Sequence, residues 1–238
     1  MKTIFTTIIA LTLFTFTSCK KESDKEATTE EAVVETEAPV DEETASFEPF
    51  QIMAISYSVK NYDTWKKVFE EHESTRAASG LTTRALARGT DNPNKIYLFL
   101  NVADMQKAKE YAANPKLKEV RKTAGVTSEP EVIYSNVVRF EESPVEFKDR
   151  VRVSIKIKDF DAWLKVYDAE GKEIRLANGL IDRAIAQSID DPNMIYVTFA
   201  VSDMTKAKTY MKAPELKKLM TEAGVISKPI MEYYTSVE

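Results

Sequence analysis

Alternating apolar and polar positions open the regular part of the chain. Every second residue from Met53 to Val59 is apolar or aromatic, which predicts a half-buried strand. A helix follows, because one mainly apolar stripe recurs at spacings of three and four residues: Trp65, Val68, Phe69 and His72. Gly80 ends this helix. Two further strands are predicted over residues 81–88 and 96–100, on either side of a turn at 91–94.

The next segment predicts a second, interrupted helix and a fourth strand. Asp104 is a suitable N-cap, and Asn114-Pro115 breaks the helix because proline lacks an amide hydrogen and clashes with the preceding turn. A second piece ends at Gly125, and residues 130–138 form the last strand. The order strand, helix, strand, strand, helix, strand predicts an α+β fold of the ferredoxin-like βαββαβ type, with both helices on one face of an antiparallel sheet.

The same pattern occurs twice in the chain. Residues 56–65 match 154–163 at an offset of 98, and residues 91–97 match 190–196 at an offset of 99. This spacing indicates a duplication and not a solenoid, whose periods are shorter. Each copy leaves one sheet face bare, so the two are predicted to pair face to face as an intramolecular α/β barrel, a monomeric pseudo-dimer. The expected parts are a first repeat at 50–140, a linker at 141–150 and a second repeat at 151–238.

A targeting signal is predicted before the repeats. Lys2 precedes the mainly apolar stretch 4–16, which is too short to span a bilayer as a helix and is typical of a signal peptide. The small residue before Cys19 resembles a lipobox, so we expect residues 1–18 to be removed and Cys19 to be acylated. The chain would then be a lipoprotein of the cell envelope, anchored by lipid to a membrane, with the outer membrane preferred. An ordinary secretory signal and an uncleaved anchor are the alternatives.

Charge is distributed unevenly along the chain. Residues 1–48 hold 11 of the 38 acids but only four of the 33 bases, which leaves 27 acids and 29 bases after them. Residues 19–49 therefore predict an acidic, disordered tether. The repeats are close to neutral and contain no basic stripe, so a nucleic-acid partner is not expected. Cys19 is the single cysteine, which excludes an internal disulfide.

Four short motifs of the first repeat carry a resemblance to a known fold family. They are Tyr62-Asp63-x-Trp65, residues 68–73 with Arg76, Asp91-x-Pro93-Asn94, and residues 115–126. The chain resembles the dimeric α/β-barrel superfamily, and within it the antibiotic-biosynthesis-monooxygenase-like group, over nearly all of 50–238. The resemblance implies a barrel closed by two sheets, which most members build by pairing two chains. It leaves the activity open, since the superfamily includes cofactor-free monooxygenases, haem-handling enzymes and small isomerases.

The bare sheet faces are expected to enclose a pocket. In the third strands, we assign the tyrosines to the interior and their apolar neighbours to the helix side. In the second strands, we place alanines such as Ala85 and Ala87 beneath the helices, which turns the adjacent arginines inward. Interior arginine must be paired or meet a ligand, so this pattern predicts a site for a small aromatic or anionic molecule. The alternative is that these arginines lie at the barrel mouth, paired to acids or solvated. The predicted ligand-binding residues are Arg84, Tyr97, Arg183, Tyr196 and Arg175.

His72 is the only histidine of the chain, so a histidine triad and a multi-histidine metal site are both excluded. No metal and no cofactor is expected. The resemblance makes His72 and Arg76 the favoured catalytic pair, with His72 as acid–base and Arg76 or Arg84 holding an anionic oxygen. A structural histidine is the alternative. The second repeat has Gly171 in that place and one extra residue. A π-bulge that absorbs this residue inside the helix is one interpretation, and a tolerated fault at the glycine is the other.

Two functions from different classes remain. The first is a binding module of the envelope that holds a small aromatic or anionic ligand in the barrel. The second is a cofactor-independent monooxygenase or isomerase that uses His72. The first is preferred because the chain offers a single candidate base and no second catalytic group. Haem binding through His72 is a third hypothesis.

Overall fold

The computed structural model describes residues 47–237, which form an α+β fold. The predicted signal peptide, the predicted acylation site Cys19 and nearly all of the predicted tether lie outside the described residues. Within the described part of the chain, no helix is both long enough and apolar enough to cross a membrane.

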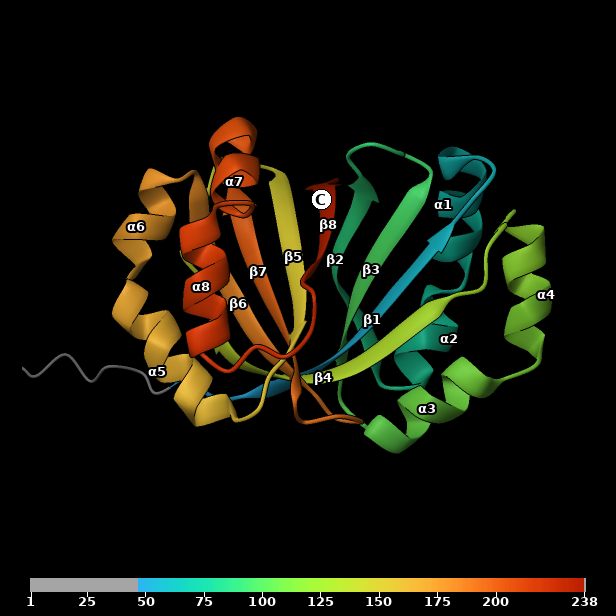
Figure 1. Cartoon of the computed structure of the whole chain (residues 1–238). Coiled ribbons are helices and arrows are strands. Elements are labelled where there is room, and N and C mark those ends of the chain that lie inside the picture. The colour runs from blue at the N-terminus through green and yellow to red at the C-terminus, as the bar shows by residue number, and fades with distance from the viewer. Residues whose placement is uncertain (1–46, 238) are drawn as a thin grey trace, which may run out of the picture. The chain divides into compact units, whose positions relative to one another are not determined.

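The described residues form eight strands and eight helices (Figure 1). The strands are β1 (Phe50–Ser58), β2 (Leu81–Gly89), β3 (Lys95–Val102), β4 (Glu131–Phe140), β5 (Asp149–Lys156), β6 (Leu180–Ser188), β7 (Met194–Val201) and β8 (Ile230–Ser236). The helices are α1 (Tyr62–Glu71), α2 (Glu73–Ala78), α3 (Met105–Ala113), α4 (Lys116–Thr123), α5 (Phe160–Glu170), α6 (Lys172–Ala177), α7 (Met204–Tyr210) and α8 (Pro214–Glu222). The first and second halves therefore share one order of elements: strand, two helices, strand, strand, two helices, strand.

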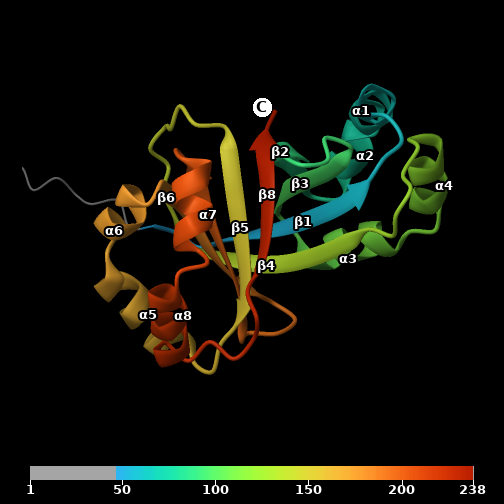
Figure 2. The same ribbon diagram turned by 45° about the horizontal axis from the view of Figure 1, so that its top comes forward.

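The eight strands close into one antiparallel barrel in the order β1-β3-β2-β8-β5-β7-β6-β4. Two of its seams join strands from different halves. At the first, β2 pairs with β8, with Arg88 opposite Thr235, and at the second, β4 pairs with β6, with Asn136 opposite Gln187. Figures 1 and 2 show α1–α4 beside the strands of the first half and α5–α8 beside those of the second. The helices therefore cover the outside of the sheet and leave its inner face to the barrel.

Side-chain caps determine where four helices begin. In each case an Asn or Asp side chain accepts a hydrogen bond from the amide three residues later, which satisfies a donor that has no partner inside the helix. The pairs are Asn61 with Thr64 (2.9 Å), Asp104 with Lys107 (3.1 Å), Asp159 with Ala162 (2.8 Å) and Asp203 with Lys206 (3.0 Å). The N-cap predicted at Asp104 is confirmed.

The halves differ where their first helix meets the second. The helix predicted up to Gly80 is broken at His72, which ends α1 and precedes α2. Helix α5 is one residue longer than α1 and ends at Gly171, whose φ is +85°. The π-bulge interpretation is therefore wrong. The extra residue is accommodated at the break between two helices, where glycine reaches a positive φ without a clash from a Cβ.

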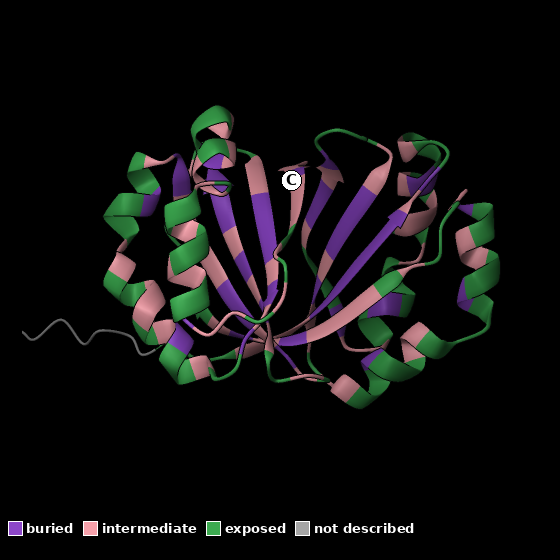
Figure 3. Ribbon diagram, viewed as in Figure 1, coloured by how far each residue is buried: buried purple, intermediate pink, exposed green. Residues whose placement is uncertain are grey.

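An apolar core lies between the helices and the sheet in each half, and Figure 3 shows the buried positions along the strands. In the first half, Trp65 is 2% exposed and stacks on Phe69 with ring centroids 4.9 Å apart. Trp163 has the equivalent place in the second core. The third strand has the predicted orientation, since Leu98 belongs to the helix-side core and Tyr97 to a separate cluster inside the barrel.

The second strand of each half faces the opposite way from the prediction. Leu86 and Ile185 belong to the cores beneath the helices, whereas Ala87 joins the interior cluster with Tyr97 and Tyr234. Large side chains are needed beneath the helices because that space must be filled at the density of a protein interior. The alanines consequently face the barrel, and their assignment to the helix side was wrong.

Candidate functional site

The interior of the barrel holds a cavity of about 730 Å³, and all eight strands contribute to its wall. This volume falls within the range of small-molecule sites, roughly 300–1,000 Å³. The second strands open the space because their inward side chains end at Cβ: Ala85, Ala87, Ala184 and Ala186. Residues 145–148 of the linker complete the wall.

Positive charge predominates in the wall of this cavity. Its charged residues are Arg84, Arg150, Arg152, Arg183, Lys148 and Glu146. Arg152 is bound to Glu232 in a buried ion pair, and this partner outweighs the effect of burial and raises the pKa of Arg152. Among residues 47–237, no carboxylate lies within 4.0 Å of Arg84, Arg150 or Arg183. These three arginines therefore form no ion pair with a described carboxylate, and Glu142, Asp149 and Glu141 act on them only at longer range.

Arg84 and Arg183 line the cavity because each lies in a β-bulge, at the register shifts of β2 and β6. A bulge redirects a side chain and so allows the arginine and the alanine after it to share one wall. The Arg84 guanidinium carbon lies 4.2 Å from the ring centroid of Phe50 and 4.3 Å from that of Phe140. Its Nη1 donates to Oδ1 of Asn101 at 3.1 Å. Burial lowers the pKa of Arg84 below its usual value, so an anion nearby would be stabilising.

The linker forms part of the site, which sequence reasoning missed. Arg183 Nη1 donates to the carbonyl of Ser143 at 2.7 Å, and Arg150 Nη1 donates to the carbonyls of Phe147 and Asp149. Arg183 thus ties the linker to β6, whereas the hydrogen bonds of Arg150 are local to the end of the linker. The available signal was the pair of apolar residues Val145 and Phe147 in a mainly polar connector.

Three tyrosines provide the aromatic part of the interior. Tyr196 and Tyr234 line the cavity, and Tyr97 stacks on Tyr234 with ring centroids 4.9 Å apart. Tyr97 lies in the interior cluster, as predicted, but behind the cavity wall and not in it. Burial raises the pKa of all three hydroxyls. All three remain protonated at neutral pH, and the two that line the cavity, Tyr196 and Tyr234, can donate hydrogen bonds to a ligand.

His72 and Arg76 lie on the other face of the sheet. They line a separate cavity of about 50 Å³ beneath the helices of the first half, together with core residues such as Leu98. His72 Nδ1 lies 3.0 Å from the carbonyl oxygen of Val68, which identifies Nδ1 as the protonated nitrogen. The structure therefore does not bring His72 together with Arg84, because the sheet separates them. Nor do the described residues contain a cluster of three or more His, Cys, Asp or Glu side chains suited to a metal ion.

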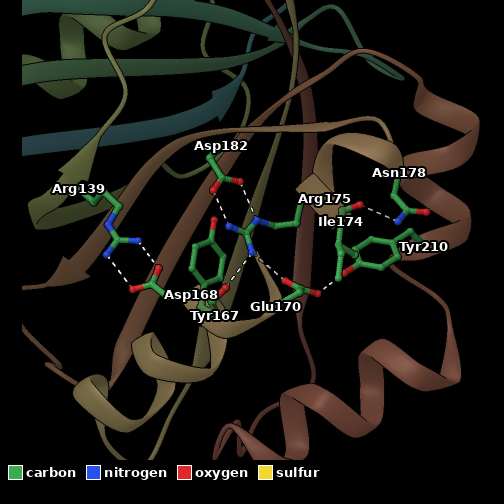
Figure 4. A network of polar contacts seen from close by, with 9 residues as sticks. All are labelled: Arg139, Tyr167, Asp168, Glu170, Ile174, Arg175, Asn178, Asp182 and Tyr210. Carbon is green, nitrogen blue, oxygen red and sulfur yellow. Dashed lines mark hydrogen bonds and ion pairs between the residues drawn. The ribbon is translucent and has the colours of Figure 1, made fainter. Parts of the chain in front are cut away.

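Arg175 also lies beneath the helices and away from the barrel cavity, which corrects its assignment to the ligand site (Figure 4). Its Nε and Nη2 donate to the two oxygens of Asp182 at 2.8 and 2.6 Å, and its Nη1 donates to Glu170 at 2.9 Å. The Tyr210 hydroxyl donates to the same glutamate. Burial opposes the charge of Arg175, but the two carboxylates outweigh it and raise its pKa. This arginine is neutralised by the protein itself.

No family model and no curated protein matches the chain significantly. Its fold is similar to that of several solved structures. An anthrone oxidase-like protein is 14% identical, with a TM-score of 0.54 over 79% of this chain and 92% of that one. A Fusobacterium nucleatum protein described as a candidate monooxygenase is 10% identical, with a TM-score of 0.51 over 80% and 93% of the two chains. At these identities the likeness shows the fold alone, and it agrees with the resemblance noted in the sequence.

Proposed function

We propose that the barrel cavity binds a small anionic aromatic molecule. The observation that carries this proposal is the set of three cavity arginines that form no ion pair with a described carboxylate: Arg84, Arg150 and Arg183. Arg84 is exposed and Arg150 and Arg183 are half-buried, so an anionic ligand would gain charge-assisted hydrogen bonds from them and would not relieve a fully buried charge. The phenyl and tyrosyl rings around these arginines suit a flat aromatic body. We further propose that the two halves are repeats that pair in the same way as the two chains of a dimeric α/β barrel. One chain is then enough to close the barrel.

The catalytic alternative is a cofactor-independent monooxygenase or isomerase that acts on the molecule in this cavity. The comparisons favour this alternative over binding alone, though only through the fold, because the two neighbours with TM-scores above 0.5 are described as oxidase-like or as a candidate monooxygenase. The chemistry suits a cationic cavity. The substrate would lose a proton, the arginines would hold the resulting enolate, and O₂ would oxidise it. With anthrone, one molecule and one O₂ would give one anthraquinone and one water.

The proton acceptor in this alternative differs from the one predicted. His72 lies behind the sheet, whereas Glu146 is the one carboxylate in the cavity wall. Glu146 is therefore the side chain that we propose as base. The buried tyrosines are unsuited to this role because burial raises the pKa of their hydroxyls.

Binding is tested by titration with anilinonaphthalene sulfonate, an anionic aromatic probe whose fluorescence rises when it leaves water. The Arg84→Gln and Arg183→Gln variants should each weaken its affinity about tenfold, the effect of one charge-assisted hydrogen bond. Arg88→Gln is the matched control, because Arg88 also lies on β2 but donates to the carbonyl of Pro93 and lies 4.1 Å from the Tyr62 ring, outside the cavity. Equal affinity in all four proteins would overturn the binding proposal.

Catalysis is tested by oxygen consumption with anthrone. We expect the Glu146→Gln and Arg84→Gln variants to lose most of the rate and His72→Ala to retain it. No oxygen consumption above the protein-free rate would remove the oxidase alternative for this substrate and leave binding in place. Loss of the rate in His72→Ala, at unchanged stability, would restore His72 as the acid–base group and contradict the assignment to Glu146.

The cellular location is a separate proposal that rests on the sequence alone. We propose acylation at Cys19 and lipid anchoring to a membrane of the cell envelope, with the outer membrane preferred. The test is partition of the expressed chain into detergent, with mass spectrometry of the N-terminal peptide. A Cys19→Ala variant that partitions like the wild type would remove the acylation proposal.

A further inference from the structure

Each half contains one buried arginine beneath its helices, and only one of the two has carboxylate partners. Arg175 is 3% exposed and binds Glu170 and Asp182. Arg76 is 4% exposed, and no carboxylate in residues 47–237 lies within 4.0 Å of it. Burial lowers the pKa of Arg76, whereas the pKa of Arg175 is raised. The same charge is therefore neutralised in one half and not in the other.

The surroundings of the two arginines are otherwise closely matched. Arg175 donates to the carbonyl of Tyr167 and lies 3.8 Å from the centroid of its ring. Arg76 donates to the carbonyl of Phe69 and lies 3.6 Å from the centroid of that ring. Since both arginines are the fourth residue of their short helix, α6 or α2, they have equivalent positions.

His72 takes the place of the missing carboxylate. It follows Phe69 by three residues, just as Glu170 follows Tyr167, and each lines the small cavity of its own half. His72 and Glu170 are therefore equivalent positions in the two halves of the structure. Alignment of the two repeats by sequence had matched His72 with Gly171 instead. A neutral imidazole cannot neutralise a guanidinium, and Nδ1 is already engaged by the backbone.

A tyrosine completes the set of donors in both halves. In the second half, the Tyr210 hydroxyl donates to Glu170 (Figure 4). In the first half, Tyr111 lines the same small cavity as Arg76, and no acid lines that cavity to accept a hydrogen bond from its hydroxyl. The cavity beside them measures about 50 Å³, and its charged or titratable lining residues are His72, Arg76, Tyr57, Tyr111 and Arg121, with no acid among them. This space corresponds to between one and two water volumes, at ~30 Å³ each.

We propose that a small carboxylate such as formate binds in this cavity, accepting hydrogen bonds from Arg76 and Tyr111 in the position that the Glu170 carboxylate has in the second half. The size of the cavity excludes aromatic ligands, since benzene needs about 150 Å³. This site is separate from the barrel cavity and does not depend on the function proposed there. The ligand has three heavy atoms, so its dissociation constant should be about 1 mM or weaker.

The test is a formate titration of the purified full chain, followed by thermal unfolding and by saturation-transfer NMR of the formate proton. Sodium gluconate keeps the ionic strength constant because gluconate is too large for the cavity. At a dissociation constant of about 20 mM, which is within that limit, 100 mM formate adds about 1 kcal/mol and should raise the midpoint of unfolding by about 3 °C. No shift and no saturation transfer would overturn the proposal.

Two variants locate the effect. His72→Glu places a carboxylate where Glu170 lies in the second half, so it should remove the response to formate and raise the midpoint of unfolding in its absence. Arg183→Gln removes an arginine of the barrel cavity and should leave the response unchanged. A full formate response in His72→Glu, or its loss in Arg183→Gln, would refute the site at Arg76.

The second half offers the reciprocal experiment. Glu170→Ala removes the internal carboxylate from Arg175 and should lower the midpoint of unfolding, and formate should restore part of that loss. We expect formate to raise the midpoint of unfolding of Glu170→Ala by more than it raises that of the wild type. Absence of any recovery would show that a free carboxylate cannot replace a protein carboxylate in these surroundings, which would count against the proposal.

Discussion

Replacing Asp182 with asparagine should destabilise the fold far more than the same exchange on the surface. Asp182 accepts two hydrogen bonds from Arg175, at 2.8 and 2.6 Å, and the side chain of Arg175 is only 4% exposed. Removing one partner of a buried ion pair costs about 3–5 kcal/mol when the remaining charge has no other partner. Here Glu170 still binds Arg175, so we expect a loss of about 2–3 kcal/mol.

Urea unfolding, followed by circular dichroism, measures this free energy of unfolding directly. In a thermal scan the same loss should lower the midpoint by about 5–10 °C for a domain of this size. Asp168→Asn is the matched control. Asp168 also binds an arginine through two oxygens, but the side chains of Asp168 and Arg139 are 48% and 47% exposed, and exposed pairs contribute less than about 1 kcal/mol. The reasoning is refuted if Asp182→Asn costs no more than Asp168→Asn.

Three further predictions concern other parts of the fold. Ala186→Leu should fill part of the barrel cavity and weaken the affinity for anilinonaphthalene sulfonate at least tenfold, while the stability of the protein stays nearly unchanged. Undiminished binding would show that the probe binds outside this cavity. Asp104→Ala should lower the free energy of unfolding by about 1 kcal/mol, whereas Asp104→Ser should lower it by only about a few tenths of a kcal/mol. Equal losses in the two variants would argue against a capping role for Asp104. The hydrogen bond from Arg139 lowers the pKa of Asp168, so the pair contributes stability above the unfolded pKa of aspartate and loses it as pH falls through the lowered value. Arg139→Gln should therefore be less stable than the wild type at pH 7, by less than about 1 kcal/mol, and urea unfolding at a series of lower pH values should show this difference shrinking.

Local patterns were sufficient to predict the order of elements. The alternation from Met53 to Val59 and the capping aspartate at 104 each depend on neighbours within a few residues, and both correspond to observed elements. The same is true of the third strand, where Tyr97 and Leu98 face opposite sides as alternation requires. The helix break at His72 was missed because no glycine or proline lies between Tyr62 and Ser79 to mark it.

Charge partners could not be assigned from the sequence. Arg84, Arg175 and Arg183 were expected to act together on a ligand, yet Arg175 is neutralised by Glu170 and Asp182 beneath the helices. Arg84 and Arg183 do line the cavity, although the reason given for their orientation was wrong. Both lie in β-bulges, and a bulge depends on how two strands pair and not on the pattern of one strand alone.

The sequence by itself determined the two matched series of strands and helices, the uneven distribution of charge and the helix ends at Gly80 and Gly125, because these depend on short-range periodicity and backbone preference. The tertiary structure alone decided which face of the second strand encloses the cavity, that the linker closes over it, and that His72 stands in the position of Glu170. Those features arise from contacts between residues far apart in the chain. A shift of one residue in strand register exchanges the two faces of a sheet, and no local pattern of alanine and leucine specifies that register.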